Sequence, residues 1–177
     1  NIGGLTSLVS LYLEWNHITI FPESFSNLTN LSNLSISNNL LISLPDNFGN
    51  LANLMFLDLG YNQINSIPAS IGYLQNIMYL WLFNNQLIEL PESICNLTDI
   101  WEGTDPLGFP YFASGCNQLC ESNLIPDCVE YNSNFEISLD QVYYSFPFDC
   151  PQDCPDNYLS GDLNDDGILN VLDIVLM

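Results

Sequence analysis

The sequence of 177 residues contains no lysine and no arginine, and His17 is its only histidine. Its 21 acidic residues give a formal net charge of −21 at pH 7. This composition argues against binding to nucleic acid, because no side chain is available to neutralise phosphates. It disfavours binding to anionic lipid for the same reason. Every carboxylate must therefore be met by water, by backbone N–H groups or by a bound cation.

The chain also lacks an apolar run of transmembrane length and a recognisable signal peptide, so membrane insertion is not expected. No spacing of Ser, His and Asp, or of two carboxylates, suggests catalysis, and His17 has no nucleophile near it in the sequence. We therefore expect a protein that binds or assembles, not an enzyme. Apolar residues make up 47% of the chain, which is enough to fill a core.

Cysteine is absent from the first half of the chain but clustered in the second. An even number of cysteines without histidine partners favours disulfides over zinc. The spacing of the last two is one residue longer than the redox C-x-x-C motif. Because disulfides persist in oxidising compartments, we predict an extracellular or cell-surface protein. The six residues are Cys95, Cys116, Cys120, Cys128, Cys150 and Cys154.

A unit of 23 residues recurs four times in the first half of the chain. Its pattern is L-x-x-L-x-L-x-x-N-x-L, with Ile in place of Leu at some positions, and it ends in an apolar residue followed by proline. The repeated asparagines are Asn16, Asn39, Asn62 and Asn85, and the prolines are Pro22, Pro45, Pro68 and Pro91. We expect each asparagine to turn inward and satisfy backbone groups at the bends of adjacent turns.

Each unit contains a short strand, such as residues 11–13, whose leucines point inward. One turn of 23 residues cannot bury its own leucines, so successive turns must stack around a shared core. The pattern closely resembles the leucine-rich-repeat family, in the variety with Leu-Pro or Ile-Pro, over residues 1–99. That resemblance implies an α/β repeat solenoid, a right-handed superhelix with a parallel sheet on its concave face. Ile2 and Leu5 fit the end of a preceding unit, so the chain should start inside a repeat.

The strand positions that face away from the core form rows across the repeats, and aromatic side chains gather there. Exposed aromatic clusters usually mark contact sites for proteins or sugars. The alternative is that the chain after residue 100 folds back and covers them. The residues predicted to form the ligand surface are Tyr12, Phe56, Tyr61, Tyr79, Trp81 and Phe83.

After Leu97 the period fails, although Phe112, Asn117 and Leu119 keep part of the pattern. We interpret this as a degenerate fifth repeat that closes one end of the solenoid, because terminal repeats are expected to be atypical. It belongs to a cysteine-rich C-terminal cap and linker at residues 100–158. Apolar residues alternate within residues 131–149, which predicts one or two strands along the edge of the solenoid.

Disulfides that staple such a cap to the last regular repeat are common in secreted leucine-rich-repeat proteins. The resemblance therefore implies a stapled cap here. Six cysteines can pair in many ways. The favoured pairing is Cys95–Cys116, Cys120–Cys128 and Cys150–Cys154.

Near its end the chain carries an EF-hand-like loop. Carboxylate and amide side chains occupy its first, third and fifth positions, Gly167 allows the sharp turn at the sixth, and a carboxylate stands at the twelfth. A hard cation needs six to eight converging oxygens, which this register supplies. The predicted Ca²⁺ ligands are Asp162, Asn164, Asp166, the carbonyl of Ile168, Asn170 and Asp173. The alternative is an acidic surface turn.

Aspartate in place of glutamate at the twelfth position, together with residues 161–164, resembles the calcium-binding repeat of a type I dockerin. The resemblance covers residues 159–177, which is one of the two repeats that a dockerin has. It implies Ca²⁺ as a cofactor and a cohesin-like partner. The docking surface of that family is built by both repeats, which leaves cohesin binding an open expectation.

These features together predict a secreted or cell-surface binding or adhesion module with a protein or glycan ligand on its concave face. The alternative is a structural subunit that self-assembles into an extracellular filament or surface layer, because open-ended solenoids can stack head to tail. Size-exclusion chromatography at several concentrations separates the two. A monodisperse monomer counts against the filament, and a concentration-dependent polymer counts against the adhesion module.

The calcium loop yields the first testable prediction. Three carboxylates, Asp162, Asp166 and Asp173, meet in the loop, and the chain has no lysine or arginine to relieve their repulsion. Calorimetry should detect one Ca²⁺ site with a dissociation constant on the order of micromolar to millimolar. Asp162→Ala should abolish it. Equal heats for the parent and the variant would mean that the loop is only an acidic turn.

Overall fold

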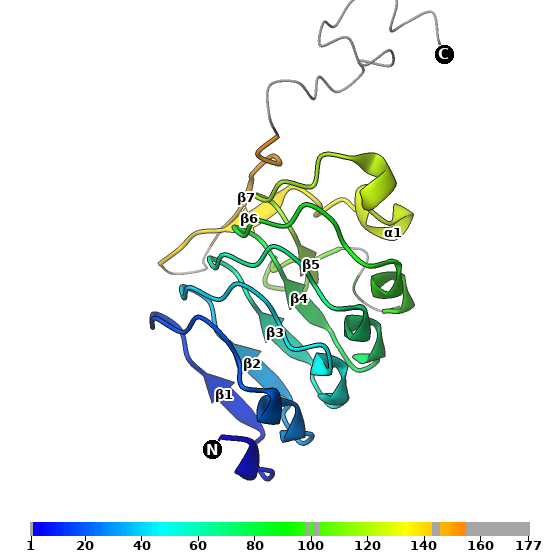
Figure 1. Cartoon of the computed structure of the whole chain (residues 1–177). Coiled ribbons are helices and arrows are strands. Elements are labelled where there is room, and N and C mark those ends of the chain that lie inside the picture. The colour runs from blue at the N-terminus through cyan, green and yellow to red at the C-terminus, as the bar shows by residue number, and fades with distance from the viewer. Residues whose placement is uncertain (1, 98–99, 101–102, 143–145, 155–177) are drawn as a thin grey trace, which may run out of the picture.

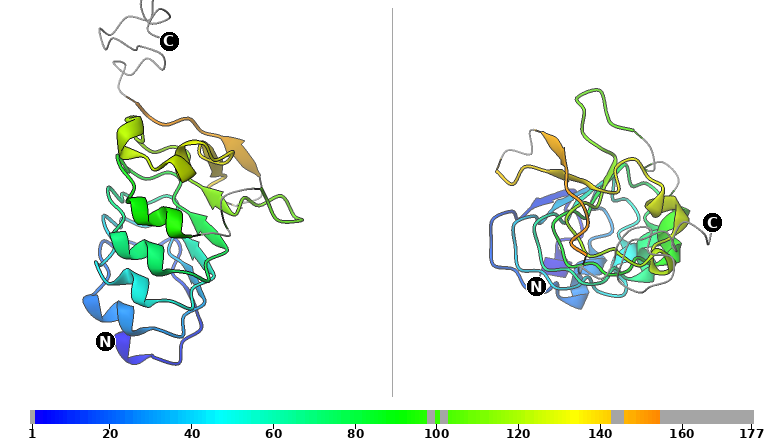
Figure 2. Two further views of the ribbon diagram at one scale, coloured as in Figure 1. Left: turned by 90° about the vertical axis from the view of Figure 1, so that its right-hand side faces the viewer. Right: turned by 90° about the horizontal axis from the view of Figure 1, so that it is seen from above.

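The computed structural model describes residues 2–97, 100, 103–142 and 146–154. In this part of the chain, successive turns stack into a solenoid, with short strands along one face and short helices along the other (Figures 1 and 2). The N-terminus lies at one end of the stack and the cysteine-rich segment at the other. The predicted repeat solenoid is confirmed.

Five strands form one parallel sheet in sequence order. They are β1 (Ser10–Tyr12), β2 (Asn33–Ser35), β3 (Phe56–Asp58), β4 (Tyr79–Trp81) and β5 (Phe112–Ala113). The register places each residue of β1 to β4 beside the residue one repeat later. Leu11, Leu34, Leu57 and Leu80 thus form a column that continues to Phe112.

The opposite face carries 3₁₀ helices of three to five residues. They are η1 (Ile2–Gly4), η2 (Glu23–Asn27), η3 (Phe48–Asn50), η4 (Ala69–Tyr73) and η5 (Glu92–Asn96). Pro22, Pro68 and Pro91 stand at the N-caps of η2, η4 and η5, with φ between −71° and −68°. Within a 23-residue turn the remaining chain is short, and the tighter helix crosses it in fewer residues.

Close stacking of these helices depends on small side chains. A Cβ added to Gly49 would lie 2.1 Å from the carbonyl oxygen of Ser70, and one added to Gly72 would lie 2.2 Å from that of Ser93. Glycine at these positions lets neighbouring turns approach. The 23-residue period of the small side chains is a signal that the leucine pattern alone does not contain.

The core fills the space between the sheet and the helices. Leu34, Leu57, Leu80, Phe48 and Phe112 are fully buried in it. Burial of one such side chain stabilises the folded state by about 1.5–3 kcal/mol. Because each turn contributes the same positions, the core is continuous along the stack.

The repeated asparagines form an internal ladder, as predicted. Asn62 donates through Nδ2 to the carbonyl oxygens of Ile36, Leu59 and Gly60, at 3.0–3.2 Å, and its Oδ1 accepts from the N–H of Leu41 at 3.0 Å. Equivalent bonds are made by Asn39, Asn85 and Asn117. Each side chain therefore joins two turns through backbone groups that would otherwise lack partners.

The residue before each ladder asparagine has a positive φ, near +50° to +60°. These residues are Trp15, Asn38, Tyr61, Asn84 and Cys116. Side chains other than glycine and asparagine rarely adopt this left-handed conformation. The hydrogen bonds of the ladder fix the bend at these positions.

Residues 112–119 form a fifth turn, as the degenerate repeat predicts. β5 pairs with β4, and Asn117 extends the ladder. Beyond this turn come η6 (Ser122–Leu124), the short helix α1 (Asp127–Glu130) and an antiparallel pair, β6 (Ile137–Leu139) and β7 (Pro147–Asp149). This pair lies beside the end of the main sheet (Figure 1).

Three disulfides hold this end together and engage all six cysteines, but the favoured pairing was wrong. The bonds are Cys95–Cys128, Cys116–Cys150 and Cys120–Cys154, with Cα–Cα distances of 5.8, 5.1 and 5.7 Å. The favoured pairing joined cysteines close in sequence. In the stacked chain, residues 33 or 34 positions apart lie side by side instead.

The ladder makes the second prediction. Asn62→Ala should strand the carbonyl groups and the N–H that the amide satisfies, and so lower the free energy of unfolding by about 1–3 kcal/mol. Denaturant unfolding measures this loss. The exposed Asn65, whose Oδ1 only accepts from the Ser66 hydroxyl, provides the control as Asn65→Ala, which should change stability little. Equal losses for the two variants would refute the ladder's role.

The third prediction concerns the disulfides. The chain has no trypsin cleavage site, so digestion with a glutamate-specific protease and chymotrypsin, followed by non-reducing mass spectrometry, is the appropriate map. It should recover the three observed pairs. Reduction should increase hydrogen exchange in residues 103–154 more than in residues 8–90, because the disulfides constrain the cap. Free thiols, or a bond between Cys150 and Cys154, would contradict the structure.

Candidate functional site

The concave face does not expose all of the aromatic residues predicted to form the ligand surface. Trp81 is 6% exposed and Phe83 is fully buried, so their assignment to an open surface was wrong. Phe83 packs over Gly60, where an added Cβ would lie 2.4 Å from the ring. Leu139 of β6 belongs to the same buried cluster. The alternative, that later chain covers this part of the face, is the one the structure supports.

Trp81 is covered by the loop that precedes β5. Its Nε1 donates to the carbonyl oxygen of Pro110 at 2.8 Å, and its ring centroid lies 6.1 Å from that of Phe109. The loop also contacts Tyr79, whose hydroxyl donates to Asp105 Oδ2 at 3.0 Å. The loop begins after the fourth repeat, where the sequence departs from the period, and periodicity therefore could not reveal this contact.

Two pKa shifts accompany the contact between Tyr79 and Asp105. Burial, the hydrogen bond to Asp105 and its negative charge raise the pKa of Tyr79 to about 12. Desolvation acts to raise the pKa of Asp105. Hydrogen bonds from the Phe109 N–H and the Tyr79 hydroxyl outweigh it and lower that pKa below its usual value. The pair thus fastens the loop to the sheet with Asp105 ionised.

The segment after β6 crosses the rim of the concave face. The Tyr61 hydroxyl donates to the carbonyl oxygen of Leu139 at 2.7 Å, and Gln141 Nε2 donates to Asn38 Oδ1 at 3.0 Å. Burial raises the pKa of Tyr61 above its ordinary value. Tyr61 therefore anchors the cap, and its side chain is only partly available to a ligand.

The rest of the concave face is open. Tyr12 is 60% exposed and Trp15 is 58% exposed, while Phe56 and Tyr79 are partly buried. Two adjoining pockets share Tyr12 and Phe56. We call them the methionine pocket and the acidic pocket.

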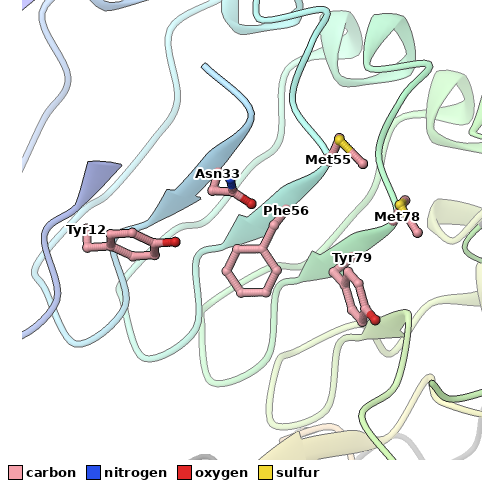
Figure 3. A pocket seen from close by; sticks show the side chains of 6 residues that line it. All are labelled: Tyr12, Asn33, Met55, Phe56, Met78 and Tyr79. Carbon is pink, nitrogen blue, oxygen red and sulfur yellow. The ribbon is translucent and has the colours of Figure 1, made fainter. Parts of the chain in front are cut away.

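The methionine pocket has a volume of about 330 Å³. Tyr12, Phe56 and Tyr79 project from three strands, while Met55 and Met78 lie at the starts of β3 and β4 (Figure 3). Unbranched methionine side chains adapt to differently shaped partners. Its lining residues are Tyr12, Asn33, Met55, Phe56, Met78 and Tyr79.

The acidic pocket has a volume of about 420 Å³ and lies farther along the strands. Strands β1 to β4 contribute one residue each from a single row: Tyr12, Ser35, Asp58 and Trp81. Its remaining lining residues are Glu14, Trp15, Ser37, Phe56 and Val142. Two carboxylates thus stand among aromatic side chains.

Asp58 is the most perturbed group of this pocket. It is 3% exposed; Ser35 Oγ donates to its Oδ2 at 3.0 Å, and the Gly60 N–H donates to its Oδ1 at 2.9 Å. Burial raises the pKa of Asp58 to about 7. The hydrogen bonds partly oppose this rise, and the charge of Glu14 adds to it.

The prediction from sequence selected aromatic residues and missed Glu14, Ser37 and Asp58. All three occupy strand-face positions in the repeats, so the alternation of side chains already placed them beside Tyr12. What it lacked was the burial of Asp58, which depends on neighbours in adjacent turns.

The described residues contain no group of three or more His, Cys, Asp or Glu that could hold a metal ion. The predicted calcium ligands at residues 162–173 lie outside the described part of the chain and stay a prediction. Among the described helices, none is long and apolar enough to cross a membrane.

Comparisons with known proteins agree with this architecture. Residues 7–28, 53–74 and 76–97 match the family model described as Leucine Rich Repeat. No match was found among curated proteins.

Solved structures give further matches. A leucine-rich-repeat protein of Leptospira interrogans is 33% identical, with a TM-score of 0.55, over 66% of this chain and 29% of that one. An internalin of Listeria monocytogenes is 27% identical, with a TM-score of 0.53, over 72% and 32%. The plant peptide hormone receptor RGFR1 in complex with RGF2 is 26% identical, with a TM-score of 0.56, over 66% and 18%. The chain thus spans less than a third of the length of each of these proteins. It contains leucine-rich repeats and has the fold of a leucine-rich-repeat solenoid.

Proposed function

We propose that this chain is a non-enzymatic binding module whose concave groove holds a segment of a partner protein. The observation that carries the proposal is the pair of adjoining pockets that share Tyr12 and Phe56. Side chains that follow one another along a bound segment could occupy both pockets. Aromatic anchors of this kind dominate the energy of many protein interfaces.

The construction of the groove supports the same proposal. Its residues stand on strands whose register is held by the parallel sheet and by the asparagine ladder. A rigid surface loses little conformational entropy on binding, so more of the contact energy appears as affinity. The methionines at one edge add adaptability where side chains of different shapes must be accommodated.

The similar structures point in the same direction. One is an internalin, and another is a peptide hormone receptor in complex with RGF2. The three disulfides fit an oxidising, extracellular or cell-surface location. Calcium binding at residues 162–173, attachment through a cohesin-like partner and filament assembly stay predictions from sequence.

The fourth prediction tests the groove. Random twelve-residue peptides displayed on phage should yield binders to the parent protein. The double variant Tyr12→Ser, Phe56→Ser should bind selected peptides at least about tenfold more weakly, a loss of about 1.4 kcal/mol or more. The matched control is Tyr73→Ser, because Tyr73 is 67% exposed on a 3₁₀ helix of the opposite face.

Affinity is measured by biolayer interferometry, and circular dichroism checks that each variant folds. Peptides that bind the double variant as well as the parent would refute the groove. A parallel glycan array separates the other predicted ligand class. Glycan binding that depends on Tyr12 and Phe56, without peptide binding, would replace the protein partner by a sugar.

A further inference from the structure

The acidic pocket has a chemistry distinct from that of the rest of the groove. The carboxylates of Asp58 and Glu14 both line it, and Tyr12, Trp15 and Phe56 contribute aromatic walls. The chain contains no lysine or arginine, so no internal ammonium or guanidinium group balances these carboxylates. A positive counter-charge of this kind must come from outside the chain.

Ser37 provides an independent sign that the pocket is incomplete without a ligand. Its side chain is fully buried, and Oγ lines the pocket. Oγ lies close enough to Asp58 to lower the pKa of that carboxyl. However, it makes no hydrogen bond of acceptable geometry to any group in the described chain. A buried hydroxyl without a partner is costly, and a ligand N–H donor would relieve it.

We propose that the acidic pocket binds the cationic side chain of an arginine or a lysine in the partner segment. The proposal rests on the function proposed above and names the chemistry of one contact. A guanidinium group offers five N–H donors in a plane and stacks on aromatic rings. Asp58, Glu14 and the Ser37 hydroxyl would accept from its donors, while Tyr12 and Phe56 would face its apolar stem and flat surface.

Other small ligands fit the pocket less well. An anion would meet two carboxylates. A calcium ion requires six to eight oxygens, whereas much of this lining is aromatic. A cation with an apolar stem matches both parts of the surface. Its volume of about 420 Å³ leaves room for such a side chain.

The protonation of Asp58 makes the contact sensitive to pH. Glu14 is the charged group that acts on Asp58, while the neighbouring Trp81 and Val142 side chains carry no charge. Burial raises the pKa of Asp58 to about 7, so the carboxyl is mostly protonated at about pH 5.5 and mostly ionised at about pH 8. A cation prefers the ionised form. Binding should therefore strengthen as the pH rises through about 7.

The fifth prediction uses small probes on the whole chain. Nα-acetyl-arginine amide is titrated against Nα-acetyl-citrulline amide, which has a similar shape but no charge, and two-dimensional NMR follows the shifts. At about pH 8 and about 150 mM salt, arginine should bind at least about tenfold more tightly. At about pH 5.5 the difference should shrink severalfold.

Asp58→Asn and Glu14→Gln should each remove most of the preference for arginine. The control is Asp46→Asn, which deletes the same charge at an exposed position and should leave the preference intact. Glu14 is only partly buried, so Glu14→Gln keeps the test valid if Asp58→Asn fails to fold. Equal affinities for the arginine and citrulline amides, or equal losses in all three variants, would overturn the proposal.

The outcome separates this proposal from the proposed function. Displayed peptides that require Tyr12 and Phe56 but contain no basic residue, with no preference for the arginine amide, would overturn the cation pocket alone. Selective binding of the arginine amide without any peptide capture would support the pocket and count against the peptide groove.

Discussion

The fold depends on one repeated set of hydrogen bonds, those of the asparagine ladder. Each internal asparagine satisfies three carbonyl groups and one N–H drawn from two successive turns, as Asn62 does. This holds the sharp bend after every strand, including the left-handed backbone at Trp15 and Tyr61. With the bend fixed, each strand starts in the same register as its neighbour. The rows of side chains on the concave face then follow from the alternation along each strand.

Stacking turns the period of the sequence into contact in space. Residues about one turn apart become neighbours, which is why Cys95 bonds to Cys128 and why Ser35 donates to Asp58. The same rule explains the glycines on the opposite face, where Gly49 must leave room for the backbone of Ser70. Sites on such a molecule are therefore assembled from single residues of several turns, and no local motif marks them.

The sequence predicted whatever repeats. The strands, the ladder and the fifth turn at Asn117 follow from positions that recur with the period or keep part of its pattern. The regular hydrogen bonds of Asn53 and Asn76 to the turn before were missed, although their spacing is also 23 residues. Trp81 could not be placed, because it is covered by a loop without periodicity. The ligand surface was therefore only partly predicted: Tyr12 lies in the open groove, whereas Phe83 is buried beneath the cap.

The charge of the chain gives the acidic pocket its meaning. In most proteins a buried carboxylate is paired with an internal lysine or arginine. Here no such partner exists, and the folded protein either protonates Asp58 or retains a desolvated negative charge. Both states are less favourable than a paired carboxylate. The fold tolerates this at a point that lines an open pocket beside aromatic side chains, where a visiting cation has access. A perturbed carboxyl in such a position is typical of a functional site, because a purely structural role would be served as well by a neutral side chain.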